Sequence, residues 1–227
     1  MDYIRLSRAP SGIAVDDYPN AVRVVAVQSD AANRLQDLAL HERDLTFART
    51  CLDAIPKVAD ELGVVHRALW RSAIVHFMKC FGRGARMSLR PDAIYAGVEN
   101  AADAMQRFEY FSTLRNMHVV HDVNDYMQAA TGAIINKPGA PHKVEKVVCA
   151  SLVAETFTQA NYDHLRMLIA TAANWVRDRF DELATQITAE LEVVDYDRLI
   201  SMPSLTQVAP RVETIERARK QPQRSPL

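Results

Sequence analysis

The stretch QANYDHLRMLIATAANWVRDRFDELATQITAEL, residues 159–191, decides the fold class. Its large apolar residues recur mostly three or four positions apart, which is the spacing of one face of an α-helix. Such a face needs an apolar surface to cover it, so the stretch predicts a long helix packed against other helices. The stripe consists of Leu165, Leu168, Ile169, Ala172, Val176, Phe180, Leu183, Ile187 and Leu191.

Three further helical segments precede this stretch. The first begins after Ser29-Asp30, either of which can cap it, and Pro56 limits or kinks it. The second ends at Gly82-Arg83-Gly84, and the third follows Pro91 and runs toward Arg115. Their apolar stripes are Leu35, Leu38, Ala39, Leu45 and Leu52; then Leu69, Ala73, Ile74, Phe77 and Phe81; then Val98, Ala101, Ala102, Met105 and Phe108.

Short β-strands are predicted at two places. Turn residues occur at Thr131-Gly132 and at 137–141, between two apolar runs. These runs, Ala133-Ile134-Ile135 and Val144 to Val153, are predicted to be the strands of a small hairpin. A valine-rich run over 22–27 predicts one short strand near the N-terminus. The expected fold is mainly α: a bundle of four to five helices with a small β-hairpin inserted before the last long helix.

Three regions follow from these patterns. Residues 1–28 form an irregular lead-in that includes the short strand, and residues 29–200 form the helical domain with the β insertion at about 130–156. Residues 201–227 carry four prolines and an excess of basic residues, which predicts a flexible tail. The functional alternative for this tail is a weak electrostatic contact with RNA.

Composition narrows the class of protein. The chain has 227 residues, is 48% hydrophobic and 24% charged, and has a formal net charge of −1. These values predict a folded, soluble protein. They exclude a protein that coats nucleic acid through a general excess of basic residues, so any contact with nucleic acid is expected to be local.

The three cysteines, Cys51, Cys80 and Cys149, have no metal-site spacing and are interpreted as reduced core thiols. Without a signal-peptide core or an apolar run long enough to span a membrane, the expected location is the cytoplasm, with no membrane partner.

The segment Arg115-Asn116-Met117-His118-Val119-Val120-His121 carries the chemistry. An arginine holds a phosphate through paired hydrogen bonds, and a histidine moves a proton near neutral pH. Together these two groups suffice for RNA cleavage without a metal ion or a cofactor, and neither is expected here.

Helix geometry limits how these residues meet. At about 100° per residue, Arg115, His118 and Asp122 share one face, whereas His121 lies about 120° from Arg115. Three interpretations stay open: the helix breaks between Arg115 and His121, a second copy supplies the missing partner, or no shared site exists. Each residue also has an ordinary structural interpretation. Arg115 pairs with Asp122 or Glu109, His121 sits at a helix C-terminus, and His118 is a partly exposed helix residue.

The segment from Leu114 to Asp122 resembles the signature of the HEPN superfamily. That signature is an arginine, then a polar residue, then a histidine after four to six intervening positions; here the polar residue is Asn116 and five positions intervene. Met117 stands where many relatives have lysine. The run Phe77-Met78-Lys79-Cys80-Phe81 also resembles the helix that precedes the signature in phage-defence and mobile-element members.

The resemblance implies an all-helical bundle that dimerises with the two signatures facing each other. Many HEPN proteins are metal-independent endoribonucleases, often toxins or phage-defence effectors, and others only bind nucleotides or RNA. The implied partners are therefore an RNA substrate, a second copy of the chain, and an antitoxin or other regulatory protein. The alternative function is a non-catalytic module that binds nucleotide, RNA or protein. A third interpretation is a helical scaffold in which the motif is coincidental.

In the enzyme that the resemblance implies, the roles divide as follows. His121 acts as general base on a ribose 2′-hydroxyl or as acid on the leaving 5′-oxygen, and His118 is the second candidate for such a role. Arg115 stabilises the charge of the transition state, and Asn116 holds the phosphate or orients His121. The expected products carry a 2′,3′-cyclic phosphate and a 5′-hydroxyl.

Two auxiliary residues complete the candidate site. Tyr126 either stacks near the site or packs as an ordinary core residue, and Asp122 adjoins His121. A metal site made of His118, His121 and Asp122 is a weaker alternative, because no further ligand is assignable from the sequence.

Overall fold

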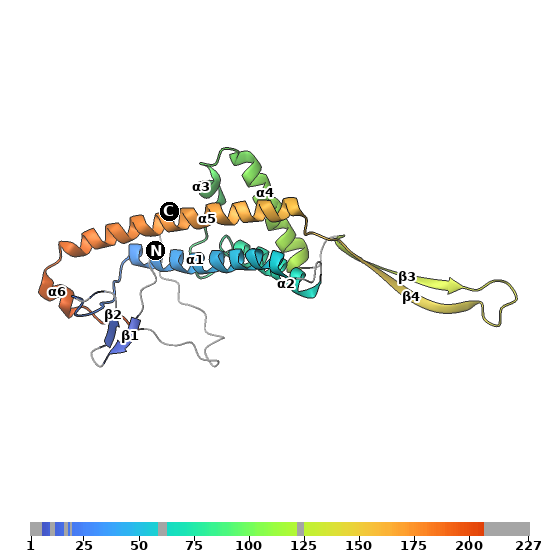
Figure 1. The fold of residues 1–227 in the computed structure, drawn as a ribbon, viewed down its shortest axis with the longest axis horizontal. Coiled ribbons are helices and arrows are strands. Elements are labelled where there is room, and N and C mark those ends of the chain that lie inside the picture. Colours follow the sequence, from blue (N-terminus) through green and yellow to red (C-terminus); the bar gives the residue numbers. More distant parts are fainter. Residues whose placement is uncertain are drawn as a thin grey trace. The chain divides into compact units, whose positions relative to one another are not determined.

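The computed structural model describes residues 6–9, 12–15, 18, 20–58, 63–121 and 125–206, and it is mostly helical (Figure 1). The expected mainly α fold with a hairpin before the last long helix is confirmed. The α-helices are α1 (Asp30–Ala54), α2 (Val64–Lys79), α3 (Pro91–Tyr95), α4 (Ala101–Leu114), α5 (Gln159–Glu192) and α6 (Tyr196–Ser201). A 3-10 turn spans Ile55–Lys57 and a π-helical turn spans Arg115–Val119. The strands form two antiparallel hairpins, β1 (Leu6–Ala9) with β2 (Gly12–Val15), and β3 (Met127–Ile135) with β4 (Val144–Val153).

The long helices α1 and α5 confirm the sequence prediction: α1 begins at the predicted cap, and α5 buries its predicted apolar stripe. The Ser29 hydroxyl accepts the Ala32 N–H at 3.0 Å, which caps α1, and the helix ends just before Pro56. All nine stripe residues of α5 are buried or half-buried, and Leu165, Leu168 and Val176 are fully enclosed. Burial of this stripe is the main hydrophobic contribution of α5 to the fold.

The chain divides into two compact units, and α1 and α5 each contribute to both. The unit formed by 45–80 and 90–171 has an aromatic core centred on Trp70. The Trp70 ring meets the Phe111 and Phe157 rings edge-on, with centroids 6.0 and 5.3 Å away, and its indole N–H donates to the Thr156 hydroxyl at 3.1 Å. This core therefore joins α2 and α4 to the segment that leads into α5.

Helix-to-helix hydrogen bonds reinforce the same unit. The buried Tyr95 hydroxyl donates to the Leu168 carbonyl at 3.2 Å, and Tyr162 donates to the Leu52 carbonyl at 3.3 Å. These bonds satisfy the polar ends of large buried rings, and they join α3 and α1 to α5.

The unit formed by 1–44, 81–89 and 172–227 contains a buried polar clamp on α1. Asp37, His41 and Asp44 are spaced along one face of the helix and all three are buried. Asp37 accepts the Met87 N–H at 2.9 Å, His41 Nε2 lies 2.7 Å from the Met87 carbonyl, and Arg86 pairs with Asp44 at 2.6 Å. Because a carbonyl oxygen only accepts, Nε2 of His41 must carry the proton. The clamp fixes the 81–89 loop against α1.

The strand predicted over 22–27 is wrong. Only Val25 takes part in β pairing there, as an isolated bridge to Ser204. The Ala26 N–H donates to the Pro203 carbonyl at 2.7 Å and the Leu205 N–H donates to the Val24 carbonyl at 3.0 Å. Pro203 has no N–H to donate, so the ladder cannot extend past it.

Four other regions differ from the prediction. The third helix is interrupted between Tyr95 and Ala101 by a turn that contains Gly97, a poor helix former. Thr131-Gly132, predicted as a turn, lies inside β3, since the strand pairs without interruption from Met127 to Ile134. In the predicted irregular lead-in, residues 6–9 and 12–15 pair as the strands β1 and β2. The predicted flexible tail falls mainly on 207–227, outside the described residues; Ser201, where that tail was to begin, is the last residue of α6.

The clamp predicts a pH-dependent stability. Burial lowers the pKa of His41 below its ordinary 6.5, so the folded protein binds this proton less readily than the unfolded chain. The free energy of unfolding therefore has its full value, as far as His41 is concerned, above pH 6.5. It decreases as the pH falls from 6.5 through the lowered pKa, by at most about 1.4 kcal/mol per pH unit. We expect urea unfolding followed by circular dichroism to show this loss between pH 7.5 and pH 5. His41→Gln, which keeps a donor for Met87, should flatten the slope, and His142→Gln at an exposed histidine should not. Equal slopes in all three proteins contradict this role.

Candidate functional site

The predicted site lies where α4 changes into the π-helical turn Arg115–Val119. The Val120 N–H donates to the Arg115 carbonyl at 3.0 Å, five residues back, instead of the four of an α-helix. The buried face of α4, which includes Phe111 and Leu114, continues to His118, the next buried position. Single π-helical turns occur often at functional sites. The turn also ends before His121, so the first of the three geometric interpretations, a helix that breaks between Arg115 and His121, describes the backbone.

Arg115 is half-buried and is held by its neighbour. Its Nη1 donates to the Asn116 side-chain oxygen at 2.7 Å, while its Nε is buried without a hydrogen-bond partner among the described residues. In that part of the chain no carboxylate pairs with Arg115, so the alternative pairing with Glu109 is absent. Asp122, the other proposed partner, lies outside the described residues. A guanidinium held by an amide keeps its positive charge available for an anion.

The two histidines of the motif occupy different environments. His118 is 8% exposed, and its ring meets Tyr126 at a steep angle with centroids 5.4 Å apart. The expectation of a partly exposed helix residue is therefore wrong, because His118 occupies a position on the buried face. His121 lies beyond the π-helical turn and is exposed. Of the two, His121 is the imidazole accessible to a ligand.

A tyrosine pair and an asparagine adjoin the motif. The Asn161 side-chain amide donates to the Tyr110 hydroxyl at 3.1 Å and to the Thr156 carbonyl at 2.9 Å. Burial raises the pKa of Tyr110, and the nearby Tyr126 adds to the rise. Both tyrosines are 36% exposed. Sequence reasoning missed Tyr110 and Asn161 because they are 51 positions apart and only the fold brings them together.

The contacts thus join Arg115 to Asn116 and His118 to Tyr126, and Tyr126 in turn neighbours Tyr110. A fixed guanidinium, an exposed imidazole and half-exposed phenol rings are groups that respectively bind phosphate, transfer a proton and stack on a base.

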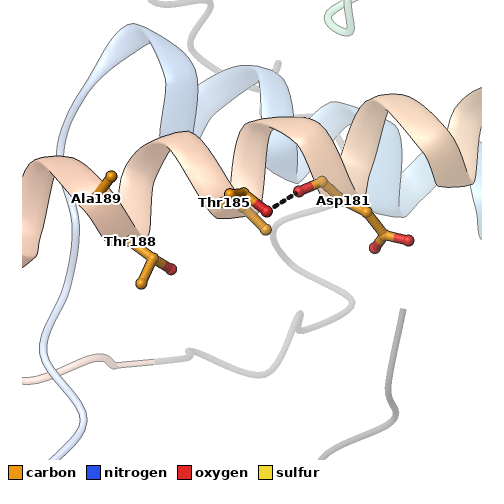
Figure 2. A pocket seen from close by; sticks show the side chains of 5 residues that line it. Asp181, Thr185, Thr188 and Ala189 are labelled. Carbon is orange, nitrogen blue, oxygen red and sulfur yellow. Dashed lines mark hydrogen bonds between the residues drawn. The ribbon is translucent and has the colours of Figure 1, made fainter.

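A shallow hollow lies on the surface of α5 (Figure 2). Its lining comes from α5 alone: Asp181, Ala184, Thr185, Thr188 and Ala189. The Thr185 hydroxyl donates to the Asp181 carbonyl within the helix at 2.9 Å, so that hydroxyl is already used by the helix backbone. The hollow includes none of the predicted site residues and offers no convergence of groups from different elements.

Among the described residues, no group of three or more histidine, cysteine or acidic side chains is placed to hold a metal ion. None of the helices in that same part of the chain combines the length and apolar character needed to cross a membrane. Comparison with protein-family models, with curated proteins and with solved structures found no match.

The contrast between the two histidines predicts different costs of substitution. His118→Ala removes a buried ring and leaves a cavity beside Tyr126, and we expect it to lower the free energy of unfolding by about 2 kcal/mol. His121→Ala removes an exposed side chain and should change it by less than about 0.5 kcal/mol. Urea unfolding of both variants measures the difference. Similar losses in the two variants would show that His121 also has a packing role.

Proposed function

We propose that this chain is a HEPN-like, metal-independent endoribonuclease that acts as a homodimer, of the kind found among toxins and phage-defence effectors. The observation that carries the proposal is the π-helical turn Arg115–Val119. It places an amide-held arginine and, just beyond it, an exposed histidine at the end of α4. The resemblance of the motif to the HEPN signature supplies the reaction class.

The proposed reaction needs two proton transfers. A base removes the proton of the ribose 2′-hydroxyl, the 2′-oxygen bonds to the adjacent phosphorus, the bond from phosphorus to the 5′-oxygen breaks, and an acid protonates that oxygen. His121 performs one of the transfers. His121 of a second copy performs the other, since His118 is buried within its own chain.

The remaining residues bind and position. Arg115 neutralises the charge that develops on the phosphorane-like transition state, and Asn116 holds the guanidinium through the 2.7 Å bond. His118 positions the turn by packing against Tyr126. Tyr110 and Tyr126 offer partly exposed rings on which unpaired bases stack, which is a common mode of single-stranded RNA recognition.

The buried position of His118 favours a second candidate, a module that binds RNA or a nucleotide without cleaving it. One exposed imidazole per motif cannot act at once as the base and the acid of a cleavage step. If two copies do not bring their His121 residues to one phosphate, the arginine and the tyrosine rings still provide a binding surface.

The first test is RNA cleavage in the presence of a chelator. We expect single-stranded RNA to be cut to products with 2′,3′-cyclic phosphate ends, identified by mass spectrometry. Arg115→Ala and His121→Ala should each reduce the rate by at least about 100-fold, because each removes a group that acts in the transition state. Arg90→Ala and His142→Ala change an exposed arginine and an exposed histidine elsewhere and serve as matched controls.

Circular dichroism of each variant must first show an intact fold. Undiminished cleavage by both motif variants would exclude the proposed mechanism. If the parent protein cleaves nothing at any pH but binds RNA, and Arg115→Ala weakens that binding, the second candidate holds instead.

A further inference from the structure

The β3–β4 hairpin is an apolar element that the described part of the chain leaves uncovered. Its two strands run side by side in Figure 1, and every residue in both is exposed. A single two-stranded hairpin is marginally stable in water, and a contiguous exposed apolar surface marks a place where another molecule binds. We therefore expect another molecule to bind to and cover this hairpin.

The strand register separates two faces of this hairpin, because directly paired residues share a face. One face, which we call the uncharged face, has no acidic or basic residue. It consists of Met127, Ala129, Thr131, Ala133, Ile135, Val144, Val147, Cys149, Ser151 and Val153. The opposite face carries Gln128 and Lys146, and Glu145 lies at the irregularity where the register shifts.

The uncharged face has the composition of a packing surface. Its largest exposed side chains include Ile135, 67% exposed, and Val147, 64% exposed. Small residues such as Ala129, Ala133 and Ser151 lie between the large ones, so the surface has both protrusions and gaps. Alternation of large and small side chains lets two faces interdigitate.

We propose that the uncharged face packs against the same face of a second copy of this chain. A two-fold axis brings identical surfaces together, so a surface that pairs with itself must avoid like charges. The uncharged face meets this condition. The opposite face would enclose Lys146 from both copies in one contact, with the cost of removing two like charges from water.

The size of the face sets the strength of this contact. Ten residues of strand span about 34 Å and two strands about 10 Å, so one face on each of two copies buries on the order of 700 Å² in total. That area is below the roughly 1,200 Å² of a standard specific interface and suits only a weak, transient contact. The dimer is therefore reversible and depends on protein concentration.

Cys149 provides a probe of the contact. It lies on the uncharged face, paired with Thr131 near the middle of the hairpin, and it is exposed, so the prediction of a core thiol is wrong for Cys149 and holds for the buried Cys51 and Cys80. Packed sheets lie about 10 Å apart, too far for a disulfide but within reach of a short bismaleimide cross-linker.

The first experiment cross-links the full-length parent protein, at a concentration at which sedimentation velocity shows dimer, with a bismaleimide of about 10 Å span. We expect a product of twice the 25.5 kDa mass of one chain, joined through Cys149 in both copies. Cys149→Ser should abolish it. Leu152→Cys in the Cys149→Ser background places a thiol on the opposite face and should not restore it. A parent protein that forms dimers in solution without this cross-link overturns the proposal.

The second experiment is sedimentation velocity over a range of concentrations. Val147→Lys puts a charge on the uncharged face and should leave only monomer, while Leu152→Lys, at a comparably exposed position on the opposite face, should dimerise like the parent. Equal dimerisation of both variants, or a parent that stays monomeric at every concentration, overturns the proposal. Thermal unfolding checks the folding of each variant, and the cross-link needs no substitution at Val147. Neither readout involves RNA. A dimer that forms without the hairpin contact overturns only this proposal, whereas a parent that stays monomeric also contradicts the homodimer of the proposed function.

Discussion

Burial of the apolar stripe of α5 is the constraint on which the rest of the structure depends. The stripe is too long for one small core to cover, and its residues are enclosed in both compact units. In one unit Leu165 and Leu168 are buried, and the Leu168 carbonyl accepts the Tyr95 hydroxyl; in the other, Val176 and Ile187 are buried. Helix propensity alone does not hold a helix of this length in water, so its persistence requires these partners.

The fold could be predicted as far as local periodicity determines it. Patterns visible within a short stretch of sequence predict the apolar stripes of α1, α2 and α5, the Ser29 cap and the strand over Val144–Val153. The errors arose where a distant residue decides the outcome. The valines at 22–27 have strand propensity, but their partner segment contains Pro203, whose missing N–H stops the ladder on that side of the Val25–Ser204 bridge. Thr131-Gly132 has turn chemistry, but pairing with β4 holds it in a strand.

In the candidate site, too, local features could be predicted from the sequence and features that depend on distant residues could not. The candidates Arg115, Asn116 and His121 come from the motif, and the ideal-helix expectation that Arg115 and His121 lie on different faces stays a prediction, because the α-helix changes into a π-helical turn at Arg115. The π-helical turn could not be read from the sequence, because Phe111, Leu114 and His118 have the spacing of an ordinary α-helix. The role of Asn161 could not be predicted from the sequence either, since its hydrogen bond to Tyr110 exists only when α4 and α5 pack together.

Two separate physical deficits in the unit formed by 45–80 and 90–171 point to a second copy of the chain. The motif exposes one imidazole where cleavage by proton transfer needs two, and the hairpin exposes an apolar face where a stable two-stranded sheet needs a cover. The first deficit is chemical and matters only if the protein cleaves RNA. The second is hydrophobic and exists whether or not it does. A two-fold dimer is the simplest arrangement that could answer both, because each copy supplies what the other lacks.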